Sequence, residues 1–295
     1  MWNFSQFCDY ELLDASDGER LERWKDVILV RPDPQVIWRG QKKHAAWNSF
    51  NARYIRSQKG GGKWDIRNIP EDLLCSGWTI SYKDMNFLVR PTGFKHTGIF
   101  PEQAVNWDYI REKIHGEIEK TGRNINALNL FAYTGGATIA CAKAGAHVCH
   151  VDASKGIVSW ARENTAKSGL GNAPIRYIVD DCRKFIEREI RRGHKYDVLI
   201  MDPPSYGRGP SGEIWKLEDD INDLIKLSSQ LISEKPLFVL VNSYTTGLSA
   251  STVGYLLNLY FKSAYGGKVT CDEIGIPVSY TGGILPAGAC ARWEI

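Results

Sequence analysis

The sequence predicts an α/β fold, a mainly parallel sheet covered by helices, with a small β-rich domain before it. Three observations lead to this prediction. From residue 125 onward, apolar runs of strand length alternate with segments of helical composition. Acidic residues follow several of these runs, and a pair of glycines follows the first. Strands that alternate with helices favour a parallel sheet, which binds its ligands beyond the carboxyl ends of its strands.

The chain is organised around the first strand of this series and the turn after it. Residues 125–131 are an apolar run of strand length, and residues 137–144 are small and alanine-rich, which favours a helix. A tight turn is predicted between them, at Tyr133, Thr134, Gly135 and Gly136. The glycines permit positive φ and a close approach of backbone to a ligand. They match neither G-x-G-x-x-G nor a P-loop, so a pyrophosphate is not the expected ligand.

Three further strands each deliver a carboxylate at their carboxyl end. They are predicted at residues 146–151, 175–179 and 196–201, and they are followed by Asp152, by Asp180 and Asp181, and by Asp202. Helices are expected at residues 154–168, 183–192, 213–233 and 249–262, a fifth strand at 236–242, and a closing antiparallel pair at 268–274 and 288–294. Because parallel strands share one carboxyl edge, these acids are expected to line one crevice.

The first hundred residues have the pattern of a β-rich domain instead. Two hairpins are predicted, at residues 10–24 around Asp17-Gly18 and at 78–90, with further strands at 27–30 and 36–38. A helix is expected at 104–120, with Pro101 just inside its start. We therefore expect a domain of residues 1–100 and an α/β domain of residues 101–295.

Composition excludes several classes of protein. With 43% hydrophobic and 24% charged residues, the chain of 295 residues has the profile of a soluble globular protein. Seven cysteines without regular spacing indicate neither a disulfide framework nor a metal site, and they fit a cytoplasmic location. No segment has the pattern of a signal peptide or of a membrane span. The oligomeric state is not predicted.

Three segments resemble one family of enzymes. They are Thr97-Gly-Ile-Phe-Pro-Glu-Gln103, Asn129-Leu-Phe-Ala-Tyr-Thr-Gly135 and Asp202-Pro-Pro-Ser-Tyr206. With the order of the acids, they resemble class I S-adenosylmethionine-dependent methyltransferases, and more narrowly the bacterial ribosomal RNA large-subunit methyltransferase I/K group. The resemblance implies a Rossmann-like, seven-stranded methyltransferase sheet and S-adenosyl-L-methionine as cofactor. It also implies methylation (EC 2.1.1) of a base in ribosomal RNA.

Several residues are candidate cofactor contacts. Asp152 is placed to accept hydrogen bonds from both ribose hydroxyls. Asp180 or Asp181 is placed to meet the adenine amino group, while the other of the two caps the following helix. The resemblance implies that Phe100 or Gln103 reaches the methionine end. The full set of candidates is Phe100, Gln103, Phe131, Ala132, Tyr133, Thr134, Gly135, Asp152, Ala153, Ser154, Asp180, Asp181 and Asp202.

The candidate catalytic residues are Asp202, Pro203, Pro204 and Tyr206. Two prolines remove backbone donors and leave carbonyls facing the site. A carboxylate and a carbonyl together orient a base through its exocyclic amine, and Tyr206 is placed to stack on the face of the base. Methyl transfer itself needs mainly in-line alignment of the acceptor. The alternative interpretation is a loop that the prolines merely stiffen.

One departure from the narrower group concerns the acceptor atom. A cytosine C5 methyltransferase attacks the ring with a cysteine thiolate, expected beside the fourth or fifth strand. The corresponding residues, 205–206 and 241–246, contain no cysteine. The acceptor atom is therefore open, and so are protein or small-molecule acceptors. A nicotinamide-dependent oxidoreductase is the alternative of another class, and the glycine spacing disfavours it.

The stretch from Arg39 to Arg67 favours an RNA partner. Its basic residues are Arg39, Lys42, Lys43, Arg53, Arg56, Lys59, Lys63 and Arg67, against the single acid Asp65. The rings of Trp47, Phe50, Tyr54 and Trp64 lie among them. Cations that pair with phosphates and rings that stack on bases are what looped or single-stranded RNA requires. The alternative is a solvated loop whose rings pack onto the domain.

Overall fold

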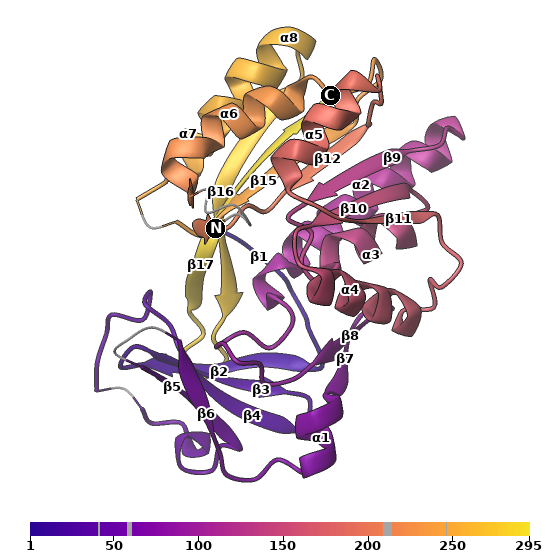
Figure 1. The fold of residues 1–295 in the computed structure, drawn as a ribbon. Coiled ribbons are helices and arrows are strands. Elements are labelled where there is room, and N and C mark those ends of the chain that lie inside the picture. The colour runs from indigo at the N-terminus through magenta and orange to yellow at the C-terminus, as the bar shows by residue number, and fades with distance from the viewer. Residues whose placement is uncertain (41, 58–60, 209–213, 246) are drawn as a thin grey trace. The chain divides into compact units, whose positions relative to one another are not determined.

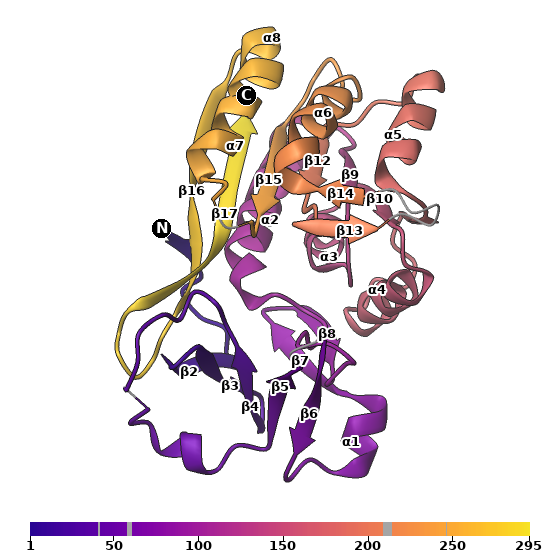
Figure 2. The ribbon, with the colours of Figure 1, turned by 60° about the vertical axis from the view of Figure 1, so that its left-hand side comes forward.

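The chain forms two compact units in the computed structural model, which describes residues 1–40, 42–57, 61–208, 214–245 and 247–295. The N-terminal unit comprises Met1–Val105 together with Gly275–Ala287, and the C-terminal unit comprises Asn106–Ile274 together with Gly288–Ile295. Figure 1 labels their helices and strands, and Figure 2 gives a second view. No helix among the described residues is long and apolar enough to cross a bilayer.

The C-terminal unit is built on one large sheet with the strand order β16-β17-β15-β12-β9-β10-β11. The central strands run parallel from β15 to β11, whereas β17 lies antiparallel to β15. The predicted α/β fold with a parallel-rich sheet is thereby confirmed. The strands are β9 (Asn126–Leu130), β10 (His147–Asp152), β11 (Ile175–Val179), β12 (Val198–Met201), β15 (Phe238–Ser243), β16 (Lys268–Pro277) and β17 (Ile284–Glu294).

Strand β9 lies at the point where the strand order reverses, with β10 on one side and β12 on the other. Open α/β sheets bind their ligands at such a switch point. The register aligns Leu130 of β9 with Val151 of β10 and with Met201 of β12. The next residue along the chain is Phe131, Asp152 or Asp202, so all three lie at the same level, and Asp152 is still paired with Val179 of β11.

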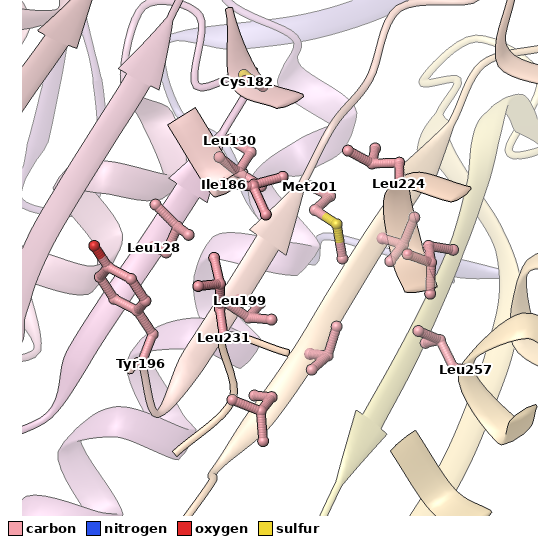
Figure 3. Close-up of a cluster of buried hydrophobic side chains, with 14 of the residues drawn as sticks. Leu128, Leu130, Cys182, Ile186, Tyr196, Leu199, Met201, Leu224, Leu231 and Leu257 are labelled. Carbon is pink, nitrogen blue, oxygen red and sulfur yellow. The ribbon is translucent and has the colours of Figure 1, made fainter. Parts of the chain in front are cut away.

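Helices cover both faces of this sheet. They are α2 (Ala104–Thr121), α3 (Gly136–Lys143), α4 (Lys155–Lys167), α5 (Cys182–Arg191), α6 (Leu217–Ser229), α7 (Ala250–Leu257), the π-helix η3 (Asn258–Lys262) and α8 (Ser263–Tyr265). Leu128 of β9 and Met201 of β12 belong to a buried cluster with Ile186 of α5, Leu224 of α6 and Leu257 of α7 (Figure 3). Apolar side chains of alternate strand residues thus face α5, α6 and α7 across one core.

The N-terminal unit is β-rich, with a five-stranded sheet in the order β2-β3-β4-β5-β6 and the separate hairpin β7-β8. Asp17 and Gly18 have φ values of 53° and 76°, which a tight turn between two strands requires. The elements are β1 (Trp2–Asn3), β2 (Tyr10–Ser16), β3 (Glu19–Trp24), β4 (Val27–Pro32), η1 (Ala45–Asn48), β5 (Ala52–Arg56), β6 (Gly62–Ile66), α1 (Glu71–Ser76), β7 (Trp78–Tyr82), β8 (Met85–Val89) and η2 (Pro101–Gln103).

Two predicted elements differ from the structure. Residues 36–38 form no strand, because their backbone hydrogen bonds are those of turns. The carbonyls of Val36 and Trp38 accept from the β2–β3 turn, and the N–H groups of Val36 and Ile37 donate to carbonyls two or three residues earlier. The helix predicted at residues 213–233 begins only at Leu217. Before it, β14 (Ile214–Lys216) pairs with β13 (Tyr206–Arg208) in an antiparallel hairpin, which suits a segment with β-branched and aromatic residues.

Candidate active site

The turn after β9 is fastened to the end of β10 through its backbone. Ala132 N donates to the carbonyl of Val151 at 3.0 Å, and Tyr133 N donates to Asp152 Oδ2 at 3.0 Å. Phe131 and Tyr133 have positive φ values of 54° and 49°, a conformation that costs free energy for residues with a side chain. The hydrogen bonds to β10 maintain this conformation, so the turn is rigidly placed beside Asp152.

The two glycines of the turn serve the packing of helices. Gly135 has φ of +90°, and a Cβ there would lie 3.2 Å from the Cβ of Ala161 in α4. A Cβ on Gly136 would lie 2.7 Å from the indole ring of Trp107 in α2. The predicted positive φ is present at Gly135. At Gly136 the absent side chain makes room for Trp107, not for a ligand, because the site of the missing Cβ is filled by that ring.

Asp152 presents a partly buried carboxylate beside the turn. Its Oδ2 accepts from Tyr133 N, and its Oδ1 accepts from Ser154 N at 2.9 Å. Burial raises the pKa of Asp152, and the two backbone donors act in the opposite direction. Because a carboxylate oxygen can accept more than one hydrogen bond, both oxygens can also accept from a ligand. This arrangement fits a vicinal diol such as the ribose of a nucleoside.

Neighbouring candidates build the wall around Asp152. Ser154 caps α4 by accepting from Ile157 N at 3.4 Å, while Ala153 is exposed. Thr134 is buried, and its carbonyl accepts from the Asn164 side chain at 3.0 Å. The side chain of Thr134 is therefore part of the packed turn, and the exposed Ala153 is left on the surface of the crevice wall.

The structure distinguishes the two acids after β11. Asp181 is the N-cap of α5, where its Oδ1 accepts from Lys184 N at 2.9 Å. Asp180 accepts from Asp181 N at 2.9 Å and forms an ion pair with Arg188. Its own N–H donates to the carbonyl of Asp152 at 3.1 Å. Asp180 is thus the acid that lies directly beside Asp152, and Asp181 has the capping role expected of one of the pair.

The loop after β12 is held by a residue that the sequence did not single out. Trp215 of β14 donates from Nε1 to the carbonyl of Pro204 at 2.6 Å, and its ring lies 5.7 Å from that of Phe131. Pro203 is buried. The carbonyl of Pro204 thus accepts a hydrogen bond from the indole, and the role of the proline carbonyls at the site stays a prediction. No local signal marks Trp215, since its partner lies 11 residues away across a hairpin.

Tyr206 lies on the hairpin that follows the loop. It is the first residue of β13, opposite Lys216 of β14, and 51% of its surface is exposed. Gly207 and Trp215 are paired at the next position, so they lie on the other face of the hairpin, which packs toward Pro204. The Tyr206 ring is accordingly accessible to a flat partner.

A buried polar network lies near Asp202. Asn106 Oδ1 accepts from Arg292 Nη2 at 2.6 Å and from the Cys290 thiol at 3.4 Å, and Asn106 Nδ2 donates to Asn242 Oδ1 at 3.0 Å. Burial raises the pKa of Cys290 to about 11, and the carboxylate of Asp202 adds to that rise. The thiol beside Asp202 is therefore protonated at neutral pH, which removes it as a nucleophile.

Cys182 is likewise a structural cysteine. It is buried, and its sulfur accepts from Phe131 N at 3.3 Å. Burial raises the pKa of this thiol above its ordinary range. Cys182 thus supports the backbone of the turn and offers no thiolate to a substrate.

Phe100 and Gln103 belong to the N-terminal unit. Phe100 is the N-cap of η2, Pro101 is the first residue of that helix, and Gln103 N donates to the carbonyl of Phe100 at 3.0 Å. The predicted position of Pro101 just inside a helix start is present. The contact of Phe100 and Gln103 with a cofactor stays a prediction.

Three of the four rings of the basic stretch are buried. Trp47 is 8% exposed and donates from Nε1 to Asp14 Oδ2 at 2.8 Å. Phe50 is also buried, and Tyr54 is 4% exposed and packs against Trp64, which is only partly buried. The prediction that Trp47 and Tyr54 stack on RNA is wrong, because they form part of the core of the N-terminal unit. These rings pack onto the domain, as in the alternative, but much of the stretch forms strands β5 and β6 and is not a solvated loop.

Two cations of this stretch share one counterion within the unit. Glu19 accepts from Lys42 Nζ at 2.6 Å and from Arg53 at 2.8 Å and 2.5 Å. Arg67 is exposed and lies 3.6 Å from Asp65. The other exposed cations of the stretch are Arg39, Lys43, Arg56 and Lys63. Lys59 lies outside the described residues. Only part of the predicted positive charge is therefore accessible to a partner.

The family model of S-adenosylmethionine-dependent methyltransferases matches residues 51–249. The crystal structure of the SAM-dependent methyltransferase from Agrobacterium tumefaciens is 35% identical to this chain, with a TM-score of 0.89, and the match covers 99% of this chain and 92% of that one. A parallel sheet with a carboxylate at its switch point is typical of nucleotide-binding α/β proteins. The chain belongs to the family of S-adenosylmethionine-dependent methyltransferases. The predicted cofactor is the one that defines this family.

Curated relatives carry a more specific name. The ribosomal RNA large subunit methyltransferase K/L of Shewanella frigidimarina is 34% identical over 149 residues, which is 48% of this chain and 20% of that protein. The protein of the same name from Chromohalobacter salexigens is 26% identical over 245 residues, which is 82% of this chain and 29% of that protein. This chain therefore spans less than a third of either relative.

Proposed function

We propose that this chain transfers a methyl group from S-adenosylmethionine to a base of ribosomal RNA. The observation that carries the proposal is the register of β10, β9 and β12, which aligns Val151, Leu130 and Met201. Asp152 and Asp202 therefore flank the turn at Phe131, one on either side. A cofactor bound along Asp152 would meet an acceptor held at Asp202 directly in front of β9. The names of the curated relatives support RNA as the acceptor class.

The proposed cofactor contacts follow from the hydrogen bonds of the turn. Asp152 would accept hydrogen bonds from the ribose hydroxyls, and Asp180 would accept one from the adenine amino group. The turn from Phe131 to Gly135, with Ala153 and Ser154, would form the wall beside the ribose. Phe100 and Gln103 are proposed for the methionine end, as the resemblance of residues 97–103 implies.

The proposed catalytic residues position the acceptor. S-adenosylmethionine supplies a methyl group that its sulfonium charge already activates. Asp202 would accept from the exocyclic amine of the base, with the carbonyl of Pro203 as a second acceptor. Tyr206 would stack on the face of the base. Because the acceptor lone pair attacks in line, fixing its direction is the main contribution these residues make.

The cysteines favour nitrogen over carbon as the acceptor atom. Attack on a pyrimidine C5 position needs a thiolate beside the ring. Cys290 and Cys182 are buried and have raised pKa values. These observations support an exocyclic amine as the acceptor and make a cytosine C5 position a poor candidate.

The exposed cations of the N-terminal unit support a contact with the RNA backbone. We propose that residues 1–100 contribute Arg39, Lys43, Arg56 and Lys63 to this contact, and that residues 101–295 contain the methyl-transfer site. Neutralised phosphates release counterions, so affinity would fall by about 0.7–0.9 log units per log unit of salt for each contact. We further propose a cytoplasmic enzyme, since ribosomal RNA is its acceptor.

The test is mass spectrometry of nucleosides from ribosomal RNA of cells with and without the gene. The proposal expects one methylated nucleoside to disappear without the gene and to return with the intact chain. Purified chain, unmodified RNA and methyl-labelled S-adenosylmethionine should restore the same nucleoside. A chain carrying Asp202→Ala is the control that binds cofactor without transfer. If the nucleoside profiles of both cell lines are identical and the chain labels protein in a lysate, the acceptor is protein and not RNA.

A further inference from the structure

A cavity of about 550 Å³ lies at the amino ends of the strands, away from the carboxyl ends that carry Asp152 and Asp202. Several of its lining residues come from the starts of β9, β10 and β11, strands that are labelled in Figure 1. Its volume is in the range of sites that hold small organic ligands. The lining residues are Asn126, His147, Val148, Cys149, Ala173, Pro174, Ile175, Arg176, His194, Lys195 and Tyr196. The residues of the methyl-transfer site are not among them.

One side of this cavity is basic. Arg176 of β11 is paired in the sheet with Cys149 of β10, so its side chain emerges on the same face as those of Cys149 and His147. His194 and Lys195 approach from the loop between α5 and β12. The other side is apolar, since Val148, Ala173, Pro174 and Ile175 also line the cavity. A ligand with a negative group and a flat or apolar body would match both sides.

The acid nearest to these cations is already neutralised. Glu189 of α5 has no exposed surface and accepts from Tyr196 Oη at 2.6 Å, from His194 Nδ1 at 2.8 Å and from Arg192 Nη1 at 3.1 Å. Arg176 Nη1 lies 3.8 Å from the same carboxylate. One negative charge therefore faces two guanidinium groups, so positive charge remains in excess at the mouth of the cavity.

The basic side chains have further N–H groups for an anion. His194 engages Glu189 through Nδ1, so its Nε2 donates to an anion when both ring nitrogens carry a proton. Lys195 Nζ donates to the carbonyl of Gln230 at 2.7 Å. A carbonyl is neutral, so that contact fixes the ammonium without cancelling its charge. Arg176 is about half exposed, and its guanidinium has donors beyond the one that approaches Glu189.

We propose that this cavity binds a nucleoside phosphate. Arg176, Lys195 and His194 bind the phosphate, and the base lies against Pro174 and Ile175. A guanidinium and an ammonium on one side suit the oxygens of a phosphate, and the volume exceeds what a free inorganic ion would fill. The nucleotide is either a free mononucleotide or part of an RNA strand, because both present the same phosphate ester.

The test is calorimetry with adenosine monophosphate, adenosine and inorganic phosphate. All titrations contain saturating S-adenosylhomocysteine, so that adenine cannot enter the cofactor site. The proposal expects the monophosphate to bind the intact chain and adenosine to bind about tenfold more weakly or not at all, since it lacks the charged group. Arg176→Gln combined with Lys195→Gln should lower the affinity for the monophosphate by about tenfold or more.

Arg162→Gln is the matched control, because Arg162 lies over the ring of Tyr177, whose side chain points to the opposite face of β11 from Arg176. It should leave the affinity unchanged. If the double variant does not fold, Lys195→Gln and His194→Gln are used singly, since both positions are exposed. Equal affinities for adenosine and the monophosphate, or an unchanged affinity in these variants, would overturn the proposal.

A labelled RNA oligonucleotide distinguishes the two sources of phosphate. If RNA is the source, the monophosphate competes with the oligonucleotide and the variants lower the affinity for both ligands. If a free nucleotide is the source, the variants lower the affinity for the monophosphate but leave RNA affinity and methyl transfer unchanged. Both outcomes support the phosphate site. A loss of RNA affinity without any loss of monophosphate affinity contradicts it.

Discussion

The indole nitrogen of Trp215 donates to the carbonyl of Pro204 at 2.6 Å, and thereby ties the hairpin β13-β14 to the loop that begins at Asp202. The same ring contacts Phe131 at the end of β9. Trp215 is thus a positioning residue that connects the two loops between which a methyl donor and an acceptor must align.

We predict that Trp215→Phe lowers kcat by about tenfold, because it keeps the ring but removes the hydrogen bond that fixes the loop at Pro204, whose exposed carbonyl then accepts from water. The affinity for S-adenosylhomocysteine should be unchanged, as the turn at Phe131 keeps its aromatic neighbour. Single-turnover transfer and calorimetry measure the two quantities. Trp38→Phe is the control, since Trp38 also donates to a carbonyl, that of Ala15, but in the N-terminal unit. Equal losses in both variants would make the effect one of general stability.

Asp152→Ala should weaken cofactor binding by about 1–3 kcal/mol, the usual cost of losing hydrogen bonds to a charged acceptor. Part of this loss comes through the turn, because Tyr133 N and Ser154 N also lose their acceptor. Calorimetry with S-adenosylhomocysteine measures the affinity, and circular dichroism verifies the fold. A folded variant with unchanged affinity would restrict Asp152 to the support of the turn.

Tyr206→Ala should raise the KM for RNA while Tyr206→Phe leaves it nearly unchanged, because the proposed contact needs the ring and not the hydroxyl. Removing a stacked ring costs about 1–3 kcal/mol per base. Tyr255→Ala is the control, since Tyr255 is a similarly exposed ring on α7, at 64% of its surface. A KM equally raised by the phenylalanine variant would contradict stacking.

The carboxylate of Glu22 has no exposed surface and binds Arg31 at 2.5 Å and 2.7 Å, with Arg20 at 3.4 Å and Tyr10 Oη at 2.8 Å. We predict that Glu22→Gln destabilises the fold by about 3–5 kcal/mol, because the buried guanidinium of Arg31 loses its counterion and Arg20 keeps only Asp33, at 3.6 Å. Glu11→Gln, which breaks the half-exposed pair with Arg23, should cost no more than about 1 kcal/mol. Urea unfolding of both variants checks the difference.

Burial alone would raise the pKa of Glu22, but Arg20 and Arg31 outweigh it and lower the pKa to about 2. Because this pKa is lower than in the unfolded chain, the stabilisation is complete above the unfolded value of about 4.3 and is lost as pH falls from there toward the folded value. Urea midpoints measured across that window should fall for the natural chain and fall less for Glu22→Gln. If the urea midpoints of both proteins fall equally with pH, other groups cause the loss of stability in acid.

His150 predicts a second pH dependence in a higher window. It is buried against Thr138, and burial lowers its pKa to about 3. The unfolded chain, with a pKa of about 6.5, then binds the extra proton, so stability falls as pH decreases from about 6.5 toward the folded value. His150→Gln should flatten this part of the stability curve, whereas His115→Gln, at an exposed site, should not. An unchanged slope in His150→Gln would contradict the assignment.

The sequence predicted a site residue most directly where that residue follows a recognisable strand. Asp152 and Asp202 each follow an apolar run directly, so locating the strand also located the acid. Trp215 and the network of Asn106 with Arg292 could not be found in this way, because their partners are brought together only by folding. Asn106 and Arg292 are 186 residues apart.

The basic stretch shows how a local count can mislead. Counting charges and rings between Arg39 and Arg67 leaves out the acceptors and counterions that other parts of the chain provide for them. Trp47 meets Asp14 from 33 residues away, and Arg53 meets Glu19 from 34 residues away. The buried acceptor and the counterion lie in an earlier hairpin that no local pattern associates with these residues.

The hairpin of β16 and β17 determines which fragments of this protein contain a complete N-terminal unit. Its tip, Gly275–Ala287, belongs to the N-terminal unit, although the rest of both strands belongs to the other. There the backbone N–H groups of Ser279 and Tyr280 donate to the carbonyls of Leu12 and Leu13 at 2.9 Å and 3.0 Å. A fragment that ends near residue 100 would leave these acceptors of β2 unpaired, so no single cut yields a complete N-terminal unit. Gene fusions and deletion series must therefore carry both pieces of chain.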